Sequence, residues 1–248
     1  LLGDIGNTEI KIFLLDKNSK IKKRWTFPSI GLNSQKLNSK IILSSNEKLK
    51  IKKILFSSVV PKVFKLIKKF LSKKINRVKV FELKQINLKK LITLKVNRKQ
   101  VGSDRLANAI GVMRENKNFI VIDFGTATTF DVIVNNIYLG GVIAPGVKLS
   151  LENLTNRASL IPRITLSKIS NVIGKNTSEA VKSGFFWGYS GLIDNIIKLI
   201  KKQSKKRFKI ILTGGLSHLF KNSIKAKPLI NKDLTLNGLK KVVLKLNI

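Results

Sequence analysis

The 248-residue chain contains no cysteine and only one histidine, His218. The lack of cysteine excludes disulfides and thiolate metal sites. A single histidine excludes histidine-rich metal clusters and disfavours a catalytic triad built around that residue. No uninterrupted apolar run approaches the ~20 residues that cross a bilayer, and the first residues show no signal-peptide pattern. We therefore expect a soluble, cytoplasmic protein without a membrane partner.

Acidic residues are also scarce, with 13 Asp and Glu against 49 Lys and Arg, for a formal net charge of +36. Such a charge is typical of proteins that bind nucleic acid or an anionic membrane. The lysines are spread over nearly every segment, however, and Ile and Asn are abundant as well, which indicates AT-rich codon usage. We favour this compositional explanation and predict no specific nucleic-acid partner, although the positive field attracts anionic ligands of any kind.

The order of the predicted elements repeats within the chain. A strand, an Asp-x-Gly turn, two strands, a helix and a strand follow one another from residue 1, and the same order recurs from about residue 118. We therefore predict an α/β fold of two lobes, residues 1–114 and 115–248, with a central cleft. The apolar patterns predict a hairpin over 1–16, strands at 20–27, 54–60, 78–83, 118–123, 128–134, 137–143 and 208–212, and helices at 36–50, from Pro61, at 103–114, 176–202 and 235–247.

Two turns at equivalent places in these halves are candidate phosphate sites: Asp4-Ile5-Gly6-Asn7-Thr8 and Asp123–Thr129. Glycine permits close backbone approach to a ligand, and neighbouring N–H groups and Asn or Thr side chains can donate to phosphate oxygens. The Asp at each strand end can hold a hard cation, directly or through water. The pairing of the two turns indicates a polyphosphate held from both sides.

A second candidate site is Gly102-Ser103-Asp104-Arg105, at the start of a predicted helix. In one interpretation, Asp104 does no more than place a negative charge at the positive end of the helix dipole, and Arg105 is its surface partner. Alternatively, the carboxylate accepts the proton of an attacking hydroxyl while the guanidinium binds an anionic substrate. Spacing alone leaves these two interpretations open.

Taken in order, these segments resemble the type III pantothenate kinases of the acetate and sugar kinase, Hsp70 and actin superfamily. The resemblance implies that the two lobes are duplicated ribonuclease H-like, actin-like lobes. It extends over essentially the whole chain, and the Gly-x-Asp-Arg and Gly-Lys-Asn-Thr elements are the features that separate this family from other kinases of the superfamily. The motifs that carry it are Asp4–Thr8, Val101–Ala109, Asp123–Thr129, Gly140–Gly146, Ile173–Thr177, Ser183-Gly184, Thr213–Gly215 and Asp233–Leu239.

The resemblance implies the first step of coenzyme A synthesis, in which ATP and pantothenate give ADP and 4′-phosphopantothenate. Asp104 would be the proton acceptor, and Asp123 would bind an activating monovalent cation, K⁺ or NH₄⁺. Mg²⁺ would lie near Asp4, and the protein would be a homodimer. The implied pantothenate-binding residues are Gly102, Ser103, Asp104, Arg105 and Thr177, and the implied ATP-binding residues are Asp4, Ile5, Gly6, Asn7, Thr8, Glu9, Ile10, Lys11 and Thr126.

The chain departs from the common family pattern just before this helix. Where the family often has an aromatic residue and an Asn-Pro pair, this chain has Lys95-Val96-Asn97-Arg98, so that Arg98 stands where proline is usual. Ser103 replaces the common alanine. Two alternatives to a pantothenate kinase follow from the same features: another small-molecule kinase of the superfamily, or a non-enzymatic transcriptional accessory factor.

Overall fold

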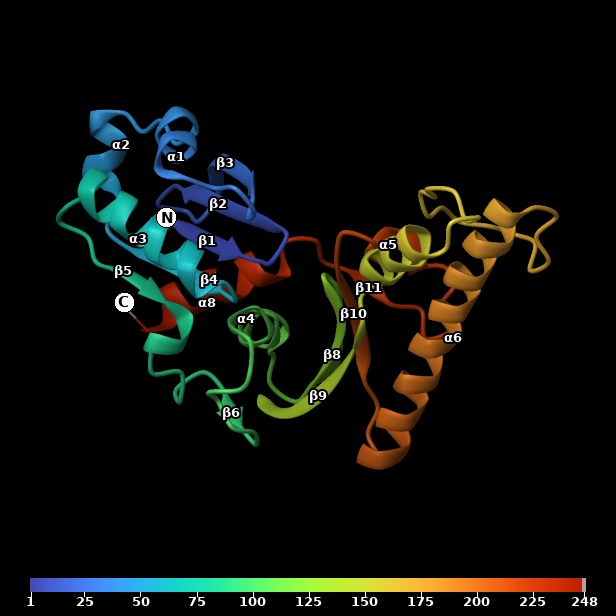
Figure 1. The fold of residues 1–248 in the computed structure, drawn as a ribbon. Helices are drawn as coiled ribbons and strands as arrows, with labels where there is room; N and C mark the ends of the chain where they lie inside the picture. Colours follow the sequence, from blue (N-terminus) through green and yellow to red (C-terminus); the bar gives the residue numbers. More distant parts are fainter. Residues whose placement is uncertain (247–248) are drawn as a thin grey trace. The chain divides into compact units, whose positions relative to one another are not determined.

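The computed structural model describes residues 1–246, which form two compact units. Unit 1 consists of Leu1–Val112 together with the segment that begins at Asp233, and unit 2 consists of Met113–Lys232. Each unit is built around its own β-sheet (Figure 1). Within the described residues, no helix has both the length and the apolar character needed to cross a membrane.

The sheet of unit 1 has the strand order β3-β2-β1-β4-β5. Strands β1 and β2 form the hairpin predicted around Gly6-Asn7, and β3 continues it antiparallel. Strands β4 and β5 run parallel to β1, so that β1 and β4 end at the same edge of the sheet. The strands are β1 (Leu2–Ile5), β2 (Glu9–Leu15), β3 (Ile21–Pro28), β4 (Ile54–Ser58) and β5 (Val80–Glu82).

Helices and short elements complete unit 1. The single helix predicted over 36–50 is two helices, because Ser44 and Glu47 form a capping box that starts a second one. Helix α3 begins at Pro61 as predicted, and its apolar face packs against the buried side of the sheet. The elements are α1 (Ser34–Lys40), α2 (Ser45–Lys50), α3 (Pro61–Lys74), the 3₁₀ turn η1 (Leu83–Gln85), β6 (Thr93–Leu94), α4 (Ser103–Val112) and α8 (Leu234–Leu246).

Unit 2 repeats the sheet of unit 1. Its strands lie in the order β9-β8-β7-β10-β11. Strands β7, β8 and β9 are antiparallel, and β10 and β11 run parallel to β7. The order and directions match those of β3-β2-β1-β4-β5, which confirms the predicted duplication. The elements are β7 (Asn118–Phe124), β8 (Ala127–Val134), β9 (Ile137–Pro145), α5 (Val147–Arg157), α6 (Thr177–Ser204), β10 (Lys209–Gly214), α7 (Ser217–Phe220) and β11 (Leu229–Ile230).

Helix α8 corrects the predicted division of the chain. The boundary predicted after residue 114 lies close to the end of the first segment at Val112, but α8 belongs to unit 1 rather than to the second lobe. It packs on α4 and β1. An amphipathic pattern shows which face of a helix is buried and not which element covers it. The helix predicted over 235–247 is α8, and Asn247 lies outside the described residues.

Helices α4 and α8 meet backbone to backbone. A Cβ atom on Gly238 of α8 would overlap the carbonyl oxygen of Ala107 on α4. The Nζ of Lys241 donates to the carbonyl oxygens of Ile110 (3.1 Å) and Gly111 (2.8 Å), which are among the last carbonyls of α4. The C-terminal half of α4 is therefore held by α8.

We predict that Gly238→Ala destabilises unit 1. The added methyl group has no space beside a backbone carbonyl, so the helices must move apart, at a cost of about 2 kcal/mol. Urea unfolding followed by circular dichroism measures this loss. The matched control is Gly191→Ala on α6, where a Cβ would meet nothing within 4 Å. The control should be neutral or stabilising, and an unchanged free energy of unfolding for Gly238→Ala would contradict the packing described.

Candidate functional site

The first Asp-x-Gly turn joins β1 to β2 in unit 1. Gly6 N donates to the Glu9 carbonyl oxygen (3.0 Å), which closes the turn, and the Ser29 hydroxyl donates to the Gly6 carbonyl oxygen (2.6 Å). Asn7 is exposed at the tip, as are Thr8 and Glu9, so their polar groups are accessible to a ligand.

Not every residue of the predicted ATP segment can offer its side chain. Ile5 and Ile10 are fully buried in the core of unit 1, so only their backbone groups are available to a ligand. Asp4 is partly buried and lies between Lys11 of β2 and Ser57 of β4 in the sheet register. The accessible part of the segment therefore consists of the turn, the exposed Lys11 and the partly buried Asp4.

The second predicted segment forms the first turn of α4, also in unit 1. The Asp104 carboxylate accepts a hydrogen bond from Arg105 N (2.7 Å), and it fills the space where a Cβ on Gly102 would lie. That same Cβ position is 3.6 Å from Val59 Cγ1. Val59 N in turn donates to the Ile5 carbonyl oxygen (3.0 Å). The start of α4 thus lies beside the edge of the sheet where β1 and β4 end.

Burial raises the pKa of the Asp104 carboxyl above its ordinary value, while the backbone N–H and positive charge of Arg105, and then the charge of Lys84, act in the opposite direction. The effect of burial is the larger. A carboxylate that served only to match the helix dipole would have its charged form stabilised and its pKa lowered. A raised pKa is common among catalytic carboxyls, so Asp104 is a candidate proton acceptor.

The second Asp-x-Gly turn lies between β7 and β8 in unit 2, where Gly125 N donates to the Ala127 carbonyl oxygen (3.1 Å). Gly214, at the end of β10, has φ +84°, and a Cβ there would lie 2.6 Å from Asp123 Oδ1. A Cβ on Gly146 would overlap the Thr126 carbonyl oxygen. Gly214 and Gly146 belong to two of the family motifs but were not among the predicted site residues. The signal in the sequence was their position after a predicted strand.

Thr177, the remaining predicted residue, is the first residue of α6 in unit 2 and is exposed. The Asn176 side chain caps this helix by accepting from Glu179 N (2.9 Å). The Glu179 carboxylate accepts from Lys175 N (2.9 Å). The Gly-Lys-Asn-Thr element is therefore a rigid helix start with an accessible hydroxyl.

Among residues 1–246, no group of three or more His, Cys, Asp or Glu side chains is placed to hold a metal ion. An all-protein metal cage is therefore not available in the described part of the chain. Mg²⁺ in kinase sites is bound by one or two carboxylates together with substrate phosphates, and the single carboxylate of Asp4 suits that arrangement.

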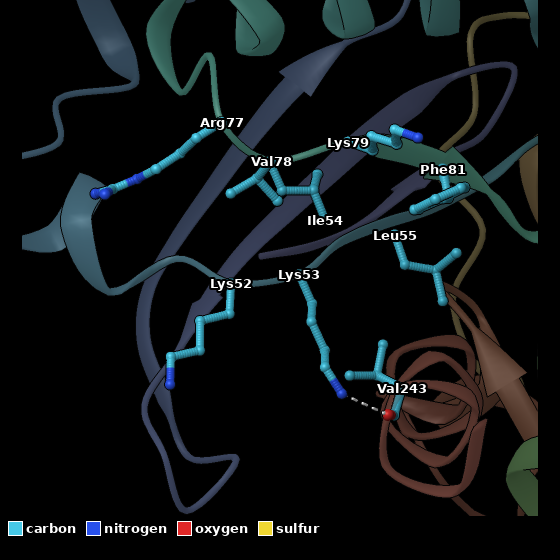
Figure 2. A pocket seen from close by; sticks show the side chains of 9 residues that line it. All are labelled: Lys52, Lys53, Ile54, Leu55, Arg77, Val78, Lys79, Phe81 and Val243. Atoms are coloured by element: carbon cyan, nitrogen blue, oxygen red, sulfur yellow. Dashed lines mark hydrogen bonds between the residues drawn. The ribbon is translucent and has the colours of Figure 1, made fainter. Parts of the chain in front are cut away.

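Unit 1 also has a cavity of about 210 Å³ where the chain enters β4 and β5 (Figure 2). Its floor is apolar, and Lys53 Nζ donates to the Val243 carbonyl oxygen of α8 (3.3 Å). The other basic side chains, on Lys52, Arg77 and Lys79, are exposed. None of the predicted site residues is among its lining residues, which are Lys52, Lys53, Ile54, Leu55, Arg77, Val78, Lys79, Phe81 and Val243.

Solved structures share the fold of the chain. A Baf family protein from Campylobacter jejuni superimposes with a TM-score of 0.65 at 23% identity, covering 99% of this chain and 98% of that one. A ROK family glucokinase from Streptomyces griseus gives a TM-score of 0.54 at 10% identity, with 98% of each chain covered. Together with the two sheets of the same order, these similarities confirm the predicted class of duplicated ribonuclease H-like, actin-like α/β lobes.

Sequence relatives identify the family within this fold. A family model described as type III pantothenate kinase matches residues 1–199. Proteins named type III pantothenate kinase are 56% identical in Pelagibacter ubique, with 96% of each chain covered, and 35% identical in Desulforapulum autotrophicum, with 97% of this chain and 94% of that one covered. A relative of the same name in Listeria monocytogenes is 34% identical over 96% of this chain and 94% of its own. The chain therefore belongs to the type III pantothenate kinase family.

Proposed function

We propose that this chain transfers the γ-phosphate of ATP to the primary hydroxyl of pantothenate, giving 4′-phosphopantothenate and ADP, the first step of coenzyme A synthesis. Membership of the family and the shared name of the relatives support this activity. The observation that carries it is the Asp104 carboxylate, which lies in the first turn of α4 beside the edge of the sheet where β1 and β4 end. It occupies the position where the resemblance implies a proton acceptor.

In the proposed reaction, Asp104 accepts the proton of the pantothenate hydroxyl as the hydroxyl oxygen bonds to the γ-phosphorus. The bond between that phosphorus and the bridging oxygen breaks, and ADP leaves. Gly102, Ser103 and Arg105 are proposed to bind pantothenate, Ser103 through its backbone because its side chain is buried, with the Arg105 guanidinium suited to the pantothenate carboxylate. Thr177 is a further pantothenate-binding residue implied by the resemblance. Positioning and charge neutralisation supply most of the acceleration, and the base contributes about 10²- to 10⁴-fold.

The ATP phosphates are proposed to bind to Asp4–Lys11 and Thr126. The exposed turn of the first segment offers N–H and side-chain donors, which suits anionic oxygens. Mg²⁺ would be held near Asp4 and would neutralise phosphate charge when bound. Asp123 would hold K⁺ or NH₄⁺. A Cβ on Gly125 would lie 3.5 Å from the Ala127 carbonyl oxygen and 3.9 Å from Asp123 Oδ1, so two oxygens lie close together there, which supports that assignment.

We also propose that the protein is a cytoplasmic homodimer. Exposed apolar side chains on three elements of unit 2 are the observation that supports an interface there. Ile143 of β9 is 64% exposed, Leu149 of α5 is 45% exposed and Trp187 of α6 is 37% exposed. No specific nucleic-acid partner is proposed, because the basic residues are spread along the whole sequence.

The proposed function predicts that Asp104→Asn lowers kcat with pantothenate by at least about 10²-fold. A coupled assay of ADP release measures this loss. The folded-state pKa of Asp104 lies above its unfolded value, so the unfolded chain releases this proton at lower pH and the ionised carboxylate costs stability at neutral pH. The asparagine variant should therefore be as stable as the wild type or more stable at pH 7. Near-normal turnover by this variant would remove Asp104 from the role of base.

A second prediction concerns the monovalent cation. Replacing K⁺ by Na⁺ at constant ionic strength should lower the rate of ADP release, because the larger ion suits an oxygen-lined site of low charge. Constant ionic strength matters because a chain of net charge +36 responds to screening. Asp123→Asn should reduce the difference between the two ions. Equal wild-type rates in K⁺ and Na⁺ would argue against the cation role of Asp123.

A further inference from the structure

We propose that Glu82 and Arg98 are positioning residues, which fix the substrate-binding segment Gly102–Arg105 by tying it to η1. The set of hydrogen bonds that joins Glu82, Arg98 and Ser103 to the backbone of η1 is called the clasp below. The proposal rests on the proposed function, since it concerns how Asp104 and its neighbours are held for phosphoryl transfer. It assigns a task to residues outside the implied catalytic and binding set.

The first link of the clasp joins Ser103 to Glu82. Ser103 is fully buried, and its hydroxyl donates to Glu82 Oε1. The other carboxylate oxygen of Glu82 accepts from Lys84 N (2.7 Å), and the Gln85 side chain accepts from Glu82 N (3.0 Å). Both oxygens of Glu82 are thus engaged at the end of β5. A hydrogen bond from a buried hydroxyl to a charged acceptor is stronger than one between neutral groups, so this link resists displacement of Ser103.

The second link joins the residues before Gly102 to the same turn. The Nη2 of Arg98 donates to the carbonyl oxygens of Lys84 (2.9 Å) and Ile86. In the opposite direction, Lys84 Nζ donates to the Lys99 carbonyl oxygen (3.1 Å). The loop that leads into α4 is therefore anchored on η1 in both directions.

The clasp acts on Asp104 through the chain. Ser103 immediately precedes Asp104, so a shift of one moves the other. A misplacement of about 1 Å can cost about 10²-fold in rate when reacting groups must meet in a fixed geometry.

The decisive experiment compares Glu82→Gln, Ser103→Ala and the double variant by steady-state kinetics with both substrates. Each single change should lower kcat/KM for pantothenate about tenfold, the worth of a hydrogen bond to a charged group. The KM for ATP should not change. Glu82→Gln keeps an acceptor oxygen but loses its charge, whereas Ser103→Ala removes the bond. The double variant should therefore be no less active than Ser103→Ala alone, because without the hydroxyl the charge of Glu82 no longer acts on residue 103. Glu115→Gln is the matched control, since Glu115 is an exposed glutamate and should leave the kinetics unaltered.

The possible outcomes separate the clasp from the proposed function. No pantothenate-dependent ADP release by the wild type would overturn the proposed function, and the role of the clasp with it. An active wild type with additive losses in the double variant, or with an equal rise in the KM for ATP, would overturn the clasp alone. If Glu82→Gln does not fold, Ser103→Ala still decides, because it removes the hydrogen bond to Glu82 with little change in volume. Wild-type kinetics for that variant would contradict the proposal.

Discussion

The backbone contact between Gly238 of α8 and Ala107 of α4 is the constraint on which the candidate site depends. It brings a helix from the end of the described chain onto the helix that carries Asp104. Lys241 then binds the last carbonyls of α4, while the other end of α4 is held through Ser103 and Glu82. A carboxylate on a helix fixed at both ends is placed with little freedom, which suits a group that must meet a hydroxyl in a defined geometry.

Duplication supplies two sheets of the same order and two Asp-x-Gly turns, yet the structure gives the turns different surroundings. The turn in unit 1 is a hairpin tip held by Ser29, with exposed donors at Asn7 and its neighbours. In the turn of unit 2, Gly125 and Thr126 are exposed and Asp123 is partly buried, and Gly214 and Gly146 leave no space for a side chain beside Asp123 and the Thr126 carbonyl. The proposed function gives the first turn phosphate oxygens as its ligand and the second a monovalent cation. The same motif can therefore serve two purposes in one protein.

The sequence predicted the hairpin, most strands and the start of α4, because alternation, glycine turns and a first-turn carboxylate are local signals. It could not predict the partner of α8, because the Gly238 contact depends on a helix more than a hundred residues away. The split between α1 and α2 depended on a capping box at Ser44 that an apolar pattern does not reveal. Glu82 and Arg98 carried no motif, since their hydrogen bonds join segments that only the fold brings together.

Local burial outweighs the surrounding charge at Asp104. Arg105 and Lys84 lower the pKa of its carboxyl, but desolvation raises it more, which gives a stronger base than an ordinary aspartate. The most direct test of this account is the pH dependence of kcat/KM for pantothenate in the wild-type protein. The account predicts pantothenate-dependent ADP release that declines on the acid side, with a midpoint above the ordinary aspartate pKa of about 3.9. The absence of that activity, or a midpoint at the ordinary value, would contradict it.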